Sequence, residues 1–293
     1  LALGDFQCDS TKSLLIDAIF DRNAKVRCAA AAGLEKLGDA VWIKLIDGTI
    51  MDFIRMVKSG HVHNIESGYN KVIDPLLEAL CTKDIANEAI EALTQLNDPR
   101  VVDELIKVLE SNENWEPAAK ALGQFNDVRA VHSLVKKIEI IEQYSWRRRD
   151  YLCSIIINAI SQIDDIEAQK ALVQLLGNNN KEVITRAKAA ILTLQNPNIV
   201  ELLINRLESF PTCTHTAQIL GEKKDRRAVD ALCNAATENI KAIEALGEIG
   251  DLKAVIPLVQ IIESKDEQNG QYALDALIKL KAPNSSEHLF LFA

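Results

Sequence analysis

Histidine and cysteine are the residues of this sequence best suited to bind a metal ion, and His61 and His63 stand two positions apart, with Cys81 further along. A His-x-His pair can begin a zinc site. On a helix, however, residues i and i+2 point about 200° apart, so both histidines reach one ion only from a loop or a strand. We therefore interpret them as ordinary polar residues and expect neither a metal site nor another cofactor.

Groups that would support catalysis do not converge in the sequence. Serine, histidine and aspartate all occur, but no serine has the strand-turn-helix surroundings of a nucleophile, and a Gly-rich phosphate loop is missing. No C-x-x-C pair occurs, which favours reduced thiols in a cytoplasmic protein. The six cysteines are Cys8, Cys28, Cys81, Cys153, Cys213 and Cys233. The sequence thus favours a protein that is not an enzyme.

One dense basic cluster, Arg147, Arg148 and Arg149, follows Trp146 and precedes Asp150. Such a cluster can bind phosphate, and nucleic-acid binding is one alternative function. The whole chain, however, has 33 basic and 42 acidic residues and a formal net charge of -9, so its overall field repels a phosphate backbone. Nucleic acid is a disfavoured partner.

Composition points to helices and to a soluble chain. Hydrophobic residues make up 48% and aromatic residues 5%, a balance typical of helices that pack through Ala, Leu and Ile. No apolar run approaches the ~18 residues that cross a bilayer, and the first ten residues lack the pattern of a signal peptide. We expect a cytoplasmic protein without a membrane partner.

An internal repeat organises the chain. Several segments share an Ala-Leu step, an apolar residue three positions on, and an Asp two positions after that. Taking the Leu of that step as an anchor gives a series spaced about 30 residues apart, which is enough for two helices of about three turns and two short turns. The anchors are Leu3, Leu34, Ile65, Leu93, Leu122, Ile160, Ile191, Leu220, Leu246 and Leu277.

Each repeat is predicted to contain an anchor helix and a second helix. Apolar residues at helical spacing, such as Ala30, Leu34 and Leu37, predict the buried stripe of an anchor helix. An Asp five residues after the anchor is placed to cap the second helix. These residues are Asp39, Asp98, Asp127, Asp165, Asp225 and Asp251.

Cations follow four of these caps by two positions, where the helix dipole disfavours them. We interpret them as cross-repeat partners, each reaching the Asp cap of a neighbouring unit to form a ladder along one edge. The four residues are Arg100, Arg129, Arg227 and Lys253.

The units resemble the short HEAT-like repeats of phycobilisome bilin lyases over essentially the whole chain. The best matches are Val26 to Asp39, Leu122-Gly123 with the segment Asp127 to Val131, and Leu246-Gly247 with Ile249 to Asp251. This resemblance implies an all-α fold, a right-handed α-α superhelix, or solenoid, of about nine helical hairpins. We expect one solenoid over residues 1–293 that lacks the repeats that would precede it, because the chain opens inside a unit at Ala2-Leu3-Gly4.

Some units depart from the pattern. The unit anchored at Ile65 lacks the Ala-Leu-Gly signature seen at Ala121-Leu122-Gly123 and Ala245-Leu246-Gly247. The spacing between Leu122 and Ile160 grows to 38 residues, which places extra residues around positions 139–149. Deoxyhypusine hydroxylases resemble this chain in size and repeat architecture, but they bind iron through His-Glu dipeptides. None of the five histidines is followed by Glu, so that activity is excluded.

In this repeat family the anchor helices line the concave side, so residues that flank the anchors are expected to face a ligand. Two residues after successive anchors stand Gln95, Gln124 and Gln162, whose amides can donate to and accept from a peptide backbone. We predict a scaffold or adaptor that holds a protein or peptide partner; a bilin lyase-like enzyme or chaperone of tetrapyrrole attachment is an alternative. The candidate contact residues are Gln95, Gln124, Tyr151, Asn158, Gln162, His215, Gln218 and Tyr272.

Overall fold

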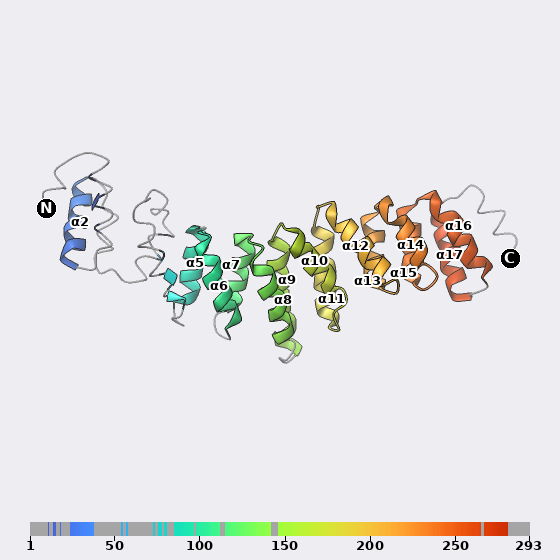
Figure 1. Cartoon of the computed structure of the whole chain (residues 1–293), viewed down its shortest axis with the longest axis horizontal. Helices are drawn as coiled ribbons and strands as arrows, with labels where there is room; N and C mark the ends of the chain where they lie inside the picture. The colour runs from blue at the N-terminus through green and yellow to red at the C-terminus, as the bar shows by residue number, and fades with distance from the viewer. Residues whose placement is uncertain are drawn as a thin grey trace. The chain divides into compact units, whose positions relative to one another are not determined.

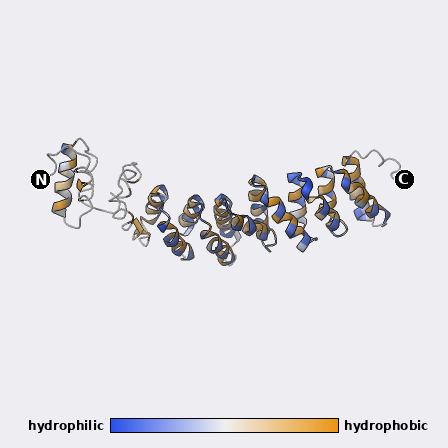
Figure 2. Ribbon diagram, turned by 45° about the horizontal axis from the view of Figure 1, so that its top comes forward, coloured by the Kyte–Doolittle hydropathy of each residue, from blue (hydrophilic) through white to orange (hydrophobic). Residues whose placement is uncertain are grey.

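The computed structural model describes residues 24–37, 85–96, 98–111, 115–141, 146–264 and 267–280, with single positions between 11 and 80. These residues form fourteen α-helices and two short 3₁₀-helices, and the described part of the chain contains no strand (Figure 1). Each helix carries both hydrophobic and hydrophilic residues along its length, as the two colours of Figure 2 show. None of the described helices has the length and apolar character needed to cross a membrane.

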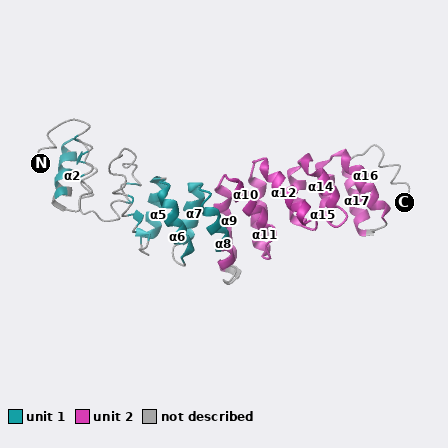
Figure 3. Cartoon of the chain, viewed as in Figure 1, with its two compact units in different colours: residues 1–137 teal, residues 138–293 magenta. Residues whose placement is uncertain are grey.

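The chain divides into two compact units, residues 1–137 and 138–293 (Figure 3). Unit 1 contains α2 (Ala24–Lys36), α5 (Ala86–Leu96), α6 (Arg100–Glu110), α7 (Trp115–Phe125) and most of α8 (Ala130–Ile141). Unit 2 contains α9 (Trp146–Gln162), α10 (Ile166–Leu175), α11 (Lys181–Thr193), α12 (Asn198–Ser209), α13 (Thr214–Lys223), α14 (Val229–Ala235), α15 (Ile240–Ile249), α16 (Val255–Glu263) and α17 (Glu267–Leu280). A single solenoid over the whole chain stays a prediction.

Helices pack in the order that a repeat architecture requires. The anchor helices of unit 2 form one layer, because α9 packs on α11, α11 on α13, α13 on α15 and α15 on α17. The second helices form another, with α10 on α12 and α12 on α14. In unit 1, α5 packs on α7 in the same way. The all-α prediction of sequential helical hairpins is confirmed.

The predicted anchors occupy the core. Leu34, Leu93, Leu122, Ile160, Ile191, Leu220 and Leu246 are 0% exposed and Leu277 is 1% exposed. The remaining two anchors, Leu3 and Ile65, lie outside the described residues. Because the eight anchors that the structure describes are all buried, the predicted register is confirmed wherever it can be observed.

The Asp residues cap the second helices as predicted. Their side chains accept the backbone N–H two residues on, at 2.8 Å for Asp98, 2.9 Å for Asp127, 2.7 Å for Asp165, 2.9 Å for Asp225 and 3.0 Å for Asp251. Asn196, five residues after Ile191, accepts from Asn198 at 3.0 Å in the same way. Asp39 lies outside the described residues. The cap position therefore needs a short side chain with an acceptor oxygen rather than a charge.

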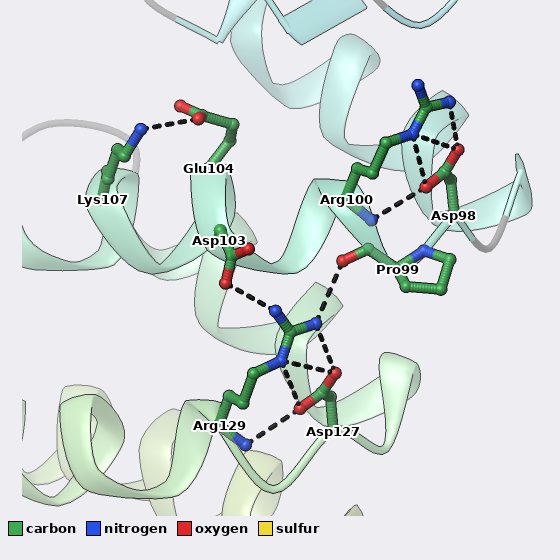
Figure 4. Close-up of polar contacts among 8 residues, drawn as sticks. All are labelled: Asp98, Pro99, Arg100, Asp103, Glu104, Lys107, Asp127 and Arg129. Atoms are coloured by element: carbon green, nitrogen blue, oxygen red, sulfur yellow. Dashed lines mark hydrogen bonds and ion pairs between the residues drawn. The ribbon is translucent and has the colours of Figure 1, made fainter. Parts of the chain in front are cut away.

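The prediction that each cation pairs with the Asp cap of a neighbouring unit is wrong for Arg100, Arg129 and Arg227. Arg100 and Arg129 turn back onto their own caps, Asp98 at 2.6 Å and Asp127 at 2.7 Å (Figure 4). Arg227 likewise pairs with its own cap, Asp225, at 2.7 Å. The reason is geometric, because an Arg two residues after an Asp on the first helical turn reaches both carboxylate oxygens without leaving its repeat.

A cross-repeat connection exists, but through other groups. The Arg129 guanidinium donates to the Pro99 carbonyl at 3.1 Å and to the Asp103 carboxylate at 2.7 Å, both in the preceding repeat (Figure 4). Arg227 donates to the carbonyl of Pro197 at 3.2 Å. Both arginines thus reach a proline carbonyl thirty residues earlier in the sequence.

The extra residues of the 38-residue interval fall partly in a longer helix. Helix α9 has 17 residues, whereas α7 and α11 have 11 and 13. The lengthening places Tyr151 near the start of α9, two turns before Asn158.

Candidate binding surface on the anchor helices

A groove of about 670 Å³ lies between the anchor helices α5 and α7. Its floor includes the buried side chains of Ile90 and Ala121 and the half-buried Thr94 and Pro117. Its walls are exposed polar side chains from the two helices: Asn87, Glu91, Gln95, Lys120 and Gln124. The groove therefore combines an apolar floor with hydrogen-bonding walls, as small binding sites commonly do.

Helical periodicity explains why these residues meet. Asn87, Glu91 and Gln95 are four residues apart on α5, and Lys120 and Gln124 are four residues apart on α7, so each set forms one stripe. Because α5 packs on α7, the two stripes face the same opening. The structure thus brings together Gln95 and Gln124, two of the three glutamines that were predicted to form a row.

The two groove glutamines are available for a ligand. Within the described part of the chain, neither the Gln95 nor the Gln124 side chain hydrogen-bonds to another protein group, and both are exposed. The Thr94 hydroxyl instead donates to the Ile90 carbonyl of its own helix at 2.7 Å. The primary amides are therefore the groups in this groove that can both donate and accept.

Unit 2 carries the third glutamine on another exposed stripe. Tyr151, Asn158 and Gln162 are spaced by seven and four residues on α9, which places them on one side of that helix. All three are exposed, and Tyr151 is 55% exposed. Gln162 and Gln124 belong to different units, so a continuous row of three glutamines stays a prediction.

His215 on α13 and Tyr272 on α17 share one position in their repeats, five residues before the anchors Leu220 and Leu277. Both are half-buried, as is Gln218 on α13. Pro117, which lines the groove of unit 1, stands at the same position relative to Leu122. The register therefore puts His215 and Tyr272 on the anchor-helix side of their repeats, although they lie on separate helices.

In unit 2, the positions two residues before and two residues after some anchors carry side chains that form ion pairs. Glu222, two residues after its anchor, pairs with Lys188 of the preceding anchor helix at 2.7 Å. Glu244, two residues before its anchor, pairs with Lys241 at 2.6 Å. These side chains stabilise the protein's own surface, whereas the amides of the α5–α7 groove have no such partner among the described residues.

The basic cluster is not a uniform cationic surface. Arg148 is exposed, whereas Arg149 is half-buried with its Nε 3.7 Å from Asp150 Oδ1. Arg147 lies in α9, but its side chain is outside the described part of the structure. The carboxylate of Asp150 therefore offsets part of the positive charge of this cluster.

No group of three or more His, Cys, Asp or Glu side chains among the described residues is arranged to hold a metal ion. His61, His63 and Cys81 lie outside those residues. Cys153, Cys213 and Cys233 are free thiols, and burial is the main cause that raises the pKa of Cys233, with Asp230 and Asp251 contributing. A raised pKa disfavours the thiolate, so Cys233 is a poor nucleophile.

Sequence reasoning missed Asn87, Thr94 and Pro117 as groove residues. Asn87 stands four residues before Glu91, so the helical period of the predicted stripe could have identified it. Pro117 occupies the first turn of α7, where proline is tolerated, and no motif distinguishes it.

A model of the PBS lyase HEAT-like repeat matches residues 85–111, which span α5 and α6. No curated protein sequence matches the chain. One similar solved structure is the complex of CpcE and CpcF of phycocyanin lyase from Nostoc sp. PCC7120, at 17% identity and a TM-score of 0.39, covering 92% of this chain and 94% of that one.

Two further structures have a similar arrangement of helices. Human deoxyhypusine hydroxylase is 16% identical with a TM-score of 0.33, covering 96% of this chain and 99% of that one. YibA of E. coli is 18% identical with a TM-score of 0.34, covering 96% of this chain and 94% of that one. With such low TM-scores, these likenesses carry no argument about function.

Proposed function

We propose that this HEAT-like repeat protein is a scaffold that holds a protein or peptide partner on the exposed face of its anchor helices. The observation that carries the proposal is the α5–α7 groove, where the exposed amides of Gln95 and Gln124 stand above an apolar floor. An amide offers both a donor and an acceptor, as each residue of a peptide backbone does, so the two groups are complementary. Their exposure in the unbound protein means that no internal hydrogen bond must break on binding.

Selection from a displayed library of random peptides tests this proposal. The purified chain is compared with the double variant Gln95→Ala/Gln124→Ala, and we expect peptides enriched by the wild-type chain to bind the variant at least tenfold more weakly. Gln174→Ala, the same change at an exposed position of the second helix α10, is the matched control and keeps full affinity. Equal binding to all three proteins contradicts the proposal.

A second candidate function is attachment of a tetrapyrrole, because the matched repeat model is that of PBS lyases. Incubating the chain with a bilin and an apo-phycobiliprotein tests it directly. A coloured covalent adduct that forms faster with the chain than without it supports this activity; unchanged rates exclude it for that acceptor.

Nucleic-acid binding through Arg147, Arg148 and Arg149 is the third candidate, and the net charge of -9 and the Arg149–Asp150 contact both weaken it. Retention on heparin at low salt with a steep loss on adding salt supports it. Elution without retention contradicts it.

A further inference from the structure

We propose that the α5–α7 groove selects peptides that carry an acidic side chain, whose carboxylate pairs with Lys120. This inference rests on the proposed function and adds the chemistry of the partner. Lys120 is exposed, lines the groove, and has no hydrogen-bond or ion-pair partner among the described residues. It is also the one cation among the described residues that line this groove.

Two lysines on the anchor helices of unit 2 have the carboxylate partner that Lys120 lacks. Lys188 on α11 pairs with Glu222 on α13 at 2.7 Å, and Lys241 pairs with Glu244 of the same helix, α15, at 2.6 Å. In both pairs the glutamate stands two residues from an anchor. An acidic side chain of a bound peptide supplies the same group to Lys120.

The lining of the groove explains why Lys120 has no such partner. Gln124 stands one turn after Lys120 on α7, at the position relative to its anchor that Glu222 has on α13, and its amide is neutral. Glu91 on α5 is the only acidic residue among the described residues of the lining, and it already interacts with another group. We therefore assign the carboxylate of the peptide to Lys120 and assign no peptide contact to Glu91.

The groups around Lys120 favour an anion over a cation. Its ammonium has three donors and no acceptor, and each primary amide adds two donors. The amides of Asn87, Gln95 and Gln124 are exposed and have no hydrogen-bond partner among the described residues. One carboxylate oxygen can thus accept from Lys120 while the other accepts from Gln124, whereas a basic side chain of a peptide meets the like charge of Lys120.

An extended peptide can engage the glutamines and Lys120 together. Its residues rise about 3.3 Å each, and its side chains alternate between two faces. A peptide whose backbone bonds to Gln95 and Gln124 can therefore direct one side chain toward Lys120, which lies about 5.4 Å, or one helical turn, from Gln124 along α7. In this assignment, the glutamines supply affinity for any backbone and Lys120 supplies selectivity.

The test uses the full chain and a displayed library of random decapeptides. We expect the enriched peptides to carry Asp or Glu at one fixed position. Each is then synthesised with a fluorescent label and an amidated C-terminus, together with a copy in which this acidic residue is changed to Asn or Gln. Fluorescence anisotropy at low salt compares the two, and the acidic peptide should bind about fivefold more tightly than its amide copy.

Substitution of Lys120 assigns the preference to this residue. Lys120→Gln should bind the acidic peptide and its amide copy equally, and Lys120→Glu should enrich Lys or Arg at the same position of the peptide. Lys136→Glu changes an exposed lysine of α8 outside the groove and should retain the acidic preference. Circular dichroism confirms that every variant is folded.

The outcomes separate this inference from the function on which it rests. Peptide binding that depends on Gln95 and Gln124 but enriches no acidic position overturns the inference and leaves the scaffold proposal standing. An acidic preference that persists in Lys120→Gln does the same. If the library yields no peptide whose binding depends on Gln95 and Gln124, both proposals fail.

Discussion

Gly247 on α15 lies directly against Ala276 on α17, so a Cβ built on Gly247 would come within 2.9 Å of the Ala276 Cα. Gly221 on α13 meets Ala245 on α15 in the same way, at 2.8 Å. Each glycine follows the anchor of one repeat, and each alanine precedes the anchor of the next. The Ala-Leu-Gly signature is therefore a packing rule, because the Leu fills the core while the Gly receives the Ala of the following repeat.

Replacing Gly247 with Ala should destabilise the protein despite the better helix propensity of alanine. The added methyl group meets the Ala276 backbone, and overpacking of this kind costs about 1–3 kcal/mol. Urea unfolding followed by circular dichroism measures the change in the free energy of unfolding. Gly270→Ala on α17, where the nearest atom to the new Cβ is 4.0 Å away, is the control and should stabilise by up to about 1 kcal/mol. A stabilised Gly247→Ala variant would refute the packing rule.

A second prediction concerns the residue four positions after the anchor, which adopts a left-handed conformation in three repeats. Gly250 has φ +75°, while Asn126 and Lys224 have φ 54° and 52°. Lysine is strained there, so Lys224→Gly should raise the free energy of unfolding by about 1 kcal/mol. Gly250→Ala should lower it by a similar amount. Thermal or urea unfolding checks both, and equal stabilities of the wild type and Lys224→Gly would contradict the prediction.

A third prediction concerns pH. The pKa of Asp98 lies below its ordinary value, first because the Arg100 side chain donates to the carboxylate, with the Arg100 backbone N–H adding to the effect. A folded pKa below the unfolded pKa means that Asp98 stabilises the protein above the unfolded pKa of 3.8 and loses this contribution as pH falls through the folded pKa.

Asp98→Asn retains an acceptor for the cap but removes the titrating charge. Its loss of stability between about pH 5 and pH 3, measured by urea unfolding, should therefore be smaller than that of the wild type. A parallel pH dependence of the two proteins would show that the Asp98–Arg100 pair contributes nothing to acid sensitivity. Asp164→Asn, a change at the exposed neighbour of the cap Asp165, is the matched control.

Most of the architecture could be predicted from the sequence because repeats impose one constraint many times. Leu93 and Leu246 are both buried because each is the anchor of its repeat. A wrong choice of anchor in one unit would therefore have been corrected by the spacing of the others. The Asp caps were predictable because a capping side chain needs only the residues adjacent to it. Asn196 was missed because the predicted caps were all Asp, whereas a cap needs only an acceptor oxygen, which Asn also supplies.

Side-chain partners across repeats were not predictable in the same way. Arg129 has several acceptors within reach, and the repeat period does not decide among Asp127, Asp103 and the Pro99 carbonyl. Lys137 is a stronger example, because its position in the repeat does not predict that it is buried, at 2% exposed. Its Nζ lies 5.1 Å from the Trp115 ring centroid and donates to the Ser111 carbonyl. The exposure of Gln95 and Gln124 on one side of the anchor helices could be predicted from the register. The groove could not, since its shape depends on which exposed side chains find internal partners.

The last prediction concerns the extent of the glutamine row. If a bound peptide engages Gln95 and Gln124 only, adding Gln162→Ala to the double variant leaves the dissociation constant unchanged. If the peptide also engages Gln162, the added substitution raises the dissociation constant about fivefold further, since a lost hydrogen bond is worth about 1 kcal/mol. We expect no further loss, because all the described residues that line the groove belong to α5 and α7. The melting temperature should stay nearly constant through the series, since alanine is at least as good a helix former as glutamine. Isothermal titration with a library-selected peptide of ten or more residues measures each step, and a further rise in the dissociation constant on adding Gln162→Ala would contradict the confinement of the row to unit 1.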